Sequence, residues 1–169
     1  MVKLLGSVLV AASAAWFGFR AAERLRGQLR AMDELAAGLS LLEQELELSA
    51  PELSVLMERV SRRSRGAART LFESFGTALS GERDGCAAVL WEKCVTRTEE
   101  LIPEGKACLA PLGEILGRYD SREQRICVAA VRRRLENLRE REGARCESRC
   151  RTCRAVALSG GAFLIILLI

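Results

Sequence analysis

The sequence contains no histidine, and that absence excludes much of the chemistry a chain of 169 residues could perform. Without histidine there is no Ser–His or Cys–His nucleophilic pair, no imidazole metal ligand and no imidazole general base near neutral pH. The chain also lacks a glycine-rich phosphate loop and a paired-glycine dinucleotide turn. We therefore expect a protein that is not an enzyme, with no catalytic residues, no cofactor and no small-molecule substrate.

β-Branched residues are also scarce. Val, Ile and Thr are sparse between residues 20 and 154, where Leu, Ala, Arg and Glu dominate. The first group favours strands and the second favours helices. We therefore predict an all-α fold, an antiparallel bundle of about six helices with short connections. Turn and capping signals place these helices at about 23–47, 50–63, 66–79, 85–100, 106–118 and 121–154.

Two helix starts carry capping signals. Ser49 and Glu52 form a potential capping box, and a second start lies at residues 120–124, with either Asp120/Glu123 or Ser121/Gln124 as the reciprocal pair. Apolar residues recur at helical spacing, which predicts core positions. The expected core residues are Leu35, Leu39, Leu42, Leu46, Leu71, Phe72, Phe75, Leu79, Val89, Leu90, Trp91, Val128, Val131, Leu135 and Leu138.

Charge is missing from both ends of the chain. Residues 4–19 and 155–169 carry no charged side chain, although 28% of all residues are charged. Arginines follow the first run and precede the second, so the positive-inside rule places the middle of the chain in the cytoplasm. We predict a transmembrane helix at 1–19, a cytoplasmic helical bundle at 20–154 and a transmembrane helix at 155–169. A cleavable signal peptide is the alternative for the first run, and a buried core helix for the second.

Small residues form one face of each predicted membrane helix, and such faces let helices approach closely in lipid. We expect the two membrane helices to pack antiparallel through these faces. The predicted packing residues are Ser7, Ala11, Ala14 and Gly18 in the first helix, with Cys153, Ala157, Gly160 and Gly161 in the second.

Cys146, Cys150 and Cys153 are spaced so that one helix face carries all three thiols. Three thiolates could hold a metal if a fourth ligand were supplied, which makes a small membrane-anchored metalloprotein an alternative hypothesis. The simpler interpretation is that cysteine is small and continues the packing face toward the membrane. On that interpretation the chain has no metal ligands.

The final long helix is rich in arginine, but aromatic residues do not interrupt its basic stretch. A basic stretch beside a membrane segment suits anionic lipid headgroups, so we expect the cell membrane and not nucleic acid as its partner. Acidic residues gather instead in the middle of the chain. Among them, Glu99, Glu100 and Glu104 are predicted to lie near a surface that docks a protein partner.

Several short motifs, in this order and spacing, resemble the stage III sporulation protein AB family of endospore-forming bacteria. The resemblance spans nearly the whole chain, including both apolar ends. The motifs are Lys3-Leu4-Leu5-Gly6, Trp16-x-Gly18, Leu42-Glu43-x-Glu45, Leu71-Phe72-Glu73-x-Phe75, Leu116-Gly117-x-x-Asp120 and Gly160-Gly161.

This resemblance implies a domain similar to the helical cytoplasmic domain of the F-type platform protein of type II secretion systems. It implies a non-enzymatic scaffold in the channel complex between mother cell and forespore, located in the mother-cell membrane that faces the forespore. The implied partners are a cytoplasmic secretion-type ATPase and other stage III channel proteins. The family pattern does not include the three clustered cysteines.

Overall fold

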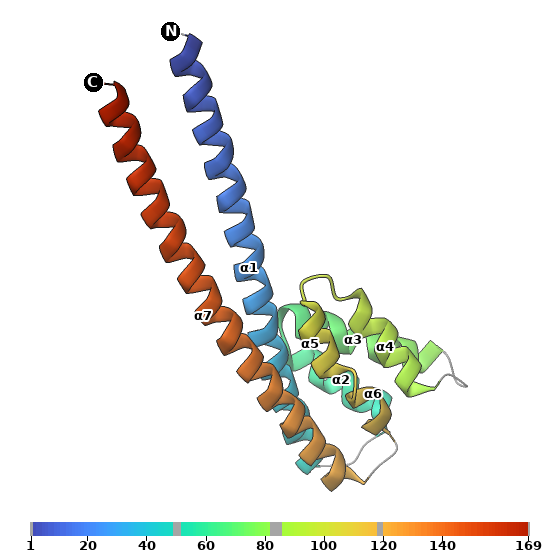
Figure 1. The fold of residues 1–169 in the computed structure, drawn as a ribbon. Helices are drawn as coiled ribbons and strands as arrows, with labels where there is room; N and C mark the ends of the chain where they lie inside the picture. The colour runs from blue at the N-terminus through green and yellow to red at the C-terminus, as the bar shows by residue number, and fades with distance from the viewer. Residues whose placement is uncertain (1, 49–51, 82–85, 118–119, 169) are drawn as a thin grey trace. The chain divides into compact units, whose positions relative to one another are not determined.

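The computed structural model describes the backbone of residues 2–48, 52–81, 86–117 and 120–168, and the side chains of 16, 20, 22–48, 52–81, 86–117 and 120–147. Within these ranges the chain forms helices and no strands, which confirms the predicted all-α fold (Figure 1). The helices are α1 (Val2–Leu48), α2 (Leu53–Arg63), α3 (Gly66–Gly81), α4 (Ala87–Arg97), α5 (Pro103–Leu109), α6 (Leu112–Ile115) and α7 (Ser121–Leu168).

The chain divides into two compact units. One unit comprises residues 28–140, which contain α2 to α6 and the inner parts of α1 and α7. The other comprises residues 1–27 and 141–169, the outer parts of α1 and α7. The predicted boundaries at 19/20 and 154/155 stay predictions.

In the unit of residues 1–27 and 141–169, few side chains are described. Trp16 is 64% exposed, and the Arg20 guanidinium lies 5.7 Å from the centre of its ring. Among the residues whose side chains the structure describes, no helical segment is long and apolar enough to cross a membrane. The predicted membrane helices and their eight packing residues, from Ser7 to Gly161, lie almost wholly outside that part of the chain.

Several predicted helix boundaries need correction. Helix α2 begins at Leu53, with Glu52 as its N-cap and no side-chain capping bond from that residue, so Glu52 is not the third residue of a capping box. Ser49 lies outside the described residues. The predicted helix at 106–118 is two short helices, α5 and α6, and α5 starts earlier, at Pro103. Proline is favourable in the first turn because it lacks only an N–H that would have no partner there.

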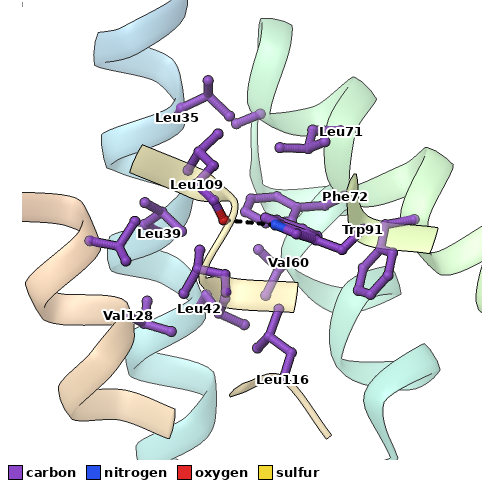
Figure 2. Close-up of a cluster of buried hydrophobic side chains, with 14 of the residues drawn as sticks. Leu35, Leu39, Leu42, Val60, Leu71, Phe72, Trp91, Leu109, Leu116 and Val128 are labelled. Carbon is purple, nitrogen blue, oxygen red and sulfur yellow. Dashed lines mark hydrogen bonds between the residues drawn. The ribbon is translucent and has the colours of Figure 1, made fainter. Parts of the chain in front are cut away.

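The core of residues 28–140 follows the predicted stripes closely (Figure 2). Leu35, Leu39 and Leu42 of α1 are fully buried, and Figure 2 shows them facing Val60, Phe72 and Val128 from three other helices. Nearly every predicted core residue is buried; Leu79 and Leu138 are half-buried against the core. Val89 is 49% exposed, so its assignment to the core was wrong: it lies on the outer face of α4, beside the buried Leu90 and Trp91.

Trp91 fixes the position of α4 within this core. Its ring is fully buried and meets the Phe75 ring edge-on, with centroids 5.0 Å apart. Its indole Nε1–H donates to the backbone carbonyl of Leu109 at 2.8 Å, the dashed line in Figure 2. A buried indole N–H needs such a partner, and this bond joins α4 to the end of α5.

Ion pairs within residues 28–140 hold α1 against α7. Arg132 donates to Glu43 at 2.7 Å and to Glu136 at 2.8 Å. Toward the other end of α1, Arg139 pairs with Asp33, whose Oδ1 lies 2.7 Å from the arginine Nε. Residue numbers rise along α1 as they fall along α7, so the two segments are antiparallel. In every ion pair that the structure describes between these helices, the acid lies on α1 and the base on α7.

A side chain from α1 also caps α3. The backbone N–H of Ala67 donates to Oε2 of Glu34 at 2.8 Å. Gly66, the first residue of α3, has a φ of +52°, and a Cβ there would overlap the Glu34 carboxylate. The carboxylate therefore occupies the positive end of the α3 dipole, a place that a glycine leaves open.

Candidate partner-docking surface

The three predicted docking residues lie where α4 gives way to α5. Glu99 and Glu100 occupy the turn after α4, and Glu104 lies in the first turn of α5. All three side chains are exposed. Helix α4 ends because Thr98 adopts an extended conformation, and Ile102, the residue before Pro103, is extended as well. Their role in docking stays a prediction.

Three contacts hold this turn in place. Lys106 donates from Nζ to the backbone carbonyl of Thr96 at 2.7 Å, which closes the turn from the α5 side. Leu101 is buried, and a Cβ on Gly105 would lie only 2.8 Å from its Cδ1. Together with the hydrogen bond from Trp91 to the end of α5, these contacts fix the position of the acidic turn relative to α4 and α5.

The same turn closes one groove of the molecule. This groove, of about 640 Å³, lies between α3 and α4, which pack against one another. Buried Leu71 and Leu90 and half-buried Cys94 line it. Glu99 and Glu100 also line it, whereas Glu104 does not. The structure thus places two of the three predicted acids beside a groove with an apolar floor.

The basic side of this groove was not predicted from the sequence. Lys93 and Arg97 line it from α4, and both are exposed. Their i, i+4 spacing puts them on one helix face, a signal that was available in the sequence. The small residues of α3 that line the groove also recur at helical spacing: Ala67, Thr70, Ser74, Ala78 and Gly81.

The cysteines show no metal centre in the described part of the chain. Cys150 and Cys153 fall outside it, and the remaining described Cys, Asp and Glu side chains form no group of three that could hold an ion. Among the other thiols, Cys86 is exposed and Cys108 is half-buried. Burial raises the pKa of the Cys108 thiol, and the Arg134 guanidinium offsets this only in part.

The fold and this surface define the class: a small all-helical protein whose candidate site is a groove between two helices with charged residues along it. The family model for stage III sporulation protein AB matches residues 3–169, and the chain therefore belongs to that family. It is 28% identical over 123 residues to stage III sporulation protein AB of Bacillus subtilis (strain 168), with 71% of each chain covered.

A solved structure of stage III sporulation protein AB (SpoIIIAB) has the same fold. It superposes with a TM-score of 0.62 at 21% identity, covering 71% of this chain and 96% of that one. The family matched here is the one that the sequence motifs predicted. Both relatives are named as sporulation proteins.

Proposed function

We propose that this protein is a non-enzymatic membrane platform in the channel complex between mother cell and forespore, and that its helical domain couples a cytoplasmic secretion-type ATPase to the channel. The observation that carries this proposal is the family match over residues 3–169, which takes in the helical domain and both apolar ends together. Other stage III sporulation proteins are the proposed neighbours in the complex.

The proposed attachment uses both ends of the chain. Residues 4–19 and 155–169 are free of charge and flanked by arginines on the side of the helical domain. This pattern supports two membrane helices with residues 20–154 in the cytoplasm, in the mother-cell membrane that faces the forespore. Packing through Gly18 and Gly161, with the other small residues predicted for the two spans, would then hold the ends together.

The proposed work of the helical domain is docking. Most of its large apolar side chains are buried in the core, and the turn that follows α4 carries the exposed carboxylates of Glu99 and Glu100. This arrangement supports a surface that binds another protein. We include Glu104 in the docking surface because it is exposed in the first turn of α5, just beyond the same turn.

Binding to the ATPase is tested with the purified full chain in detergent. We expect the ATPase to bind, and the triple change Glu99→Lys, Glu100→Lys and Glu104→Lys to weaken binding most at low salt, because the screening length falls from about 10 Å at 0.1 M to about 3 Å at 1 M. A matched triple change to Gln separates charge reversal from loss of charge. No binding by the unchanged chain at any salt would disprove direct coupling.

Topology is tested separately by labelling thiols in intact protoplasts. A membrane-impermeant maleimide should miss Cys86 and Cys94 until the cells are lysed. Labelling before lysis would contradict the proposed orientation. A mature chain that begins near Ala15 would show that the first apolar run is a signal peptide.

A further inference from the structure

We infer that the groove between α3 and α4 binds one amphipathic helix of the protein partner, with an apolar face on its floor, carboxylates one turn apart on Lys93 and Arg97, and a basic residue on Glu99 and Glu100. This inference rests on the proposed docking function and narrows it to one groove and one kind of ligand.

The floor of the groove suits a helix better than a small molecule. A small-molecule site needs polar groups that converge on the ligand and fix its orientation. The three hydroxyls that line this groove are already used within their own helices. Thr70 donates to the carbonyl of Gly66 at 3.2 Å, Ser74 to that of Leu71 at 2.9 Å, and Thr98 to that of Cys94 at 3.2 Å.

The α3 side of the groove also permits a close approach. Its side chains at Ala67, Ala78 and Gly81 are small, and nothing lies within 4 Å of where a Cβ on Gly81 would be. An incoming helix can set medium-sized apolar side chains between these positions, over Leu71 and Leu90. This is the groove-binding mode in which anchors recur at i, i+3 and i+4 along the ligand.

Charge then selects the ligand. The side chains of Lys93, Arg97, Glu99 and Glu100 are exposed and make no ion pair or hydrogen bond with any other residue that the structure describes. By contrast, Arg63, Arg132 and Arg139 each form an ion pair with an acid of α1. Two bases followed by two acids also give the groove a direction, because a ligand helix of opposite pattern fits one way round.

This mixed pattern argues against nucleic acid in the groove. A phosphate backbone attracted to Lys93 and Arg97 would meet the two glutamates at the end of the same groove. Phosphate contacts dominate the affinity of nucleic-acid binding, so adjacent carboxylates oppose it.

Cys94 makes the groove testable without any substitution. It is half-buried in the groove wall, whereas Cys86 is exposed and lines a different hollow. We expect saturating ATPase to slow maleimide labelling of Cys94 in the full chain by about tenfold at nine-tenths occupancy, since only the unbound fraction reacts. Labelling of Cys86 should stay within about twofold and serves as the internal control.

Two variants probe the groove from its two sides. Ala78→Trp places a bulky side chain in the groove and should block ATPase binding there. Its control is Ala130→Trp, which adds the same side chain at an exposed position of α7. The double reversal Lys93→Glu with Arg97→Glu should weaken ATPase binding by about tenfold at low salt, since each exposed pair contributes up to about 1 kcal/mol. The control for charge is Arg122→Glu with Arg133→Glu, two exposed arginines of α7.

The outcomes separate this inference from the proposed function. Protection of Cys94, together with weaker binding by the charge-reversal variant and normal binding by both controls, supports the groove. If the ATPase binds the full chain while Cys94 stays fully reactive, the groove inference is overturned and the docking proposal survives. If the ATPase does not bind at all, both fail. If Ala78→Trp does not fold, the protection of Cys94 from labelling and the binding of the Lys93→Glu/Arg97→Glu variant still test the groove inference.

Discussion

The capping of α3 by Glu34 gives the sharpest energetic prediction. Two features depend on one another there: the carboxylate accepts the N–H of Ala67, and Gly66 leaves room for it. Glu34→Ala removes a charge-assisted hydrogen bond and an anion at a helix N-terminus, which we expect to cost about 2 kcal/mol of unfolding free energy. Glu34→Gln keeps an acceptor, so about half of that loss should remain.

Gly66→Ala should be destabilising for two separate reasons. A Cβ at residue 66 displaces the carboxylate and so removes the same capping bond, about 2 kcal/mol. A φ of +52° adds about 1 kcal/mol for a residue with a side chain. When Glu34 is already alanine, only this second cost is left. The two changes together should therefore cost about 2 kcal/mol less than the sum of their separate costs.

The assay is urea unfolding of the full chain in detergent, followed by the fluorescence of buried Trp91 in a Trp16→Phe background. Glu73→Ala is the matched control, because its carboxylate is exposed on α3 and, among the residues that the structure describes, pairs only with Arg69, at 3.6 Å; we expect a change below about 0.5 kcal/mol. If Gly66→Ala costs the same with and without Glu34, the carboxylate does not cap α3 and the argument is refuted.

Three further predictions concern single side chains in residues 28–140. Trp91→Phe should cost about 1–3 kcal/mol, because it leaves a buried carbonyl without its donor; this variant lacks the Trp91 fluorescence, so its unfolding is followed by far-UV circular dichroism, and a urea midpoint unchanged from wild type would contradict that bond. Arg132→Met should cost about 1–2 kcal/mol and Arg125→Met below about 0.5, since the Arg132 pair is 25% and 18% exposed and the Arg125 pair 40% and 66%; equal losses would refute this ranking. Because the raised pKa of Cys108 keeps its thiol protonated, alkylation of Cys108 should begin at a higher pH in the folded chain than in the urea-unfolded chain. The stability that this shift contributes is present below the ordinary thiol pKa and is lost as pH rises through the raised pKa. Alkylation of the folded chain that begins at the same pH or at a lower pH would contradict the raised pKa.

Much of the fold could be predicted from the sequence because the residues that a helix buries are apolar and recur at helical spacing. The α1 stripe, from Leu35 to Leu46, and the α7 residues Val128 and Leu135 all proved to be core. The ends of helices were harder to predict, because proline is found both in the connection before a helix and in the first turn of a helix. Pro103 was expected to lie before a helix and instead begins one.

The candidate site was less accessible to sequence analysis. Exposure of Glu99 and Glu100 follows from their charge, but their place beside a groove depends on how α3 packs against α4. The α3 cap was missed entirely, since Glu34 and Ala67 are 33 residues apart and no local pattern links them. Contacts of this kind come from tertiary structure, which periodicity does not encode.

The antiparallel pairing of α1 and α7 has a consequence for how the protein is made. Glu43 and its partner Arg132 are 89 residues apart, and Asp33 and Arg139 are 106 apart. A ribosome must therefore complete most of the chain before α7 can cover the leucine stripe of α1. During synthesis, which proceeds at about 5–20 residues per second, the side of that stripe that α7 covers is open to chaperones and to other nascent chains for several seconds.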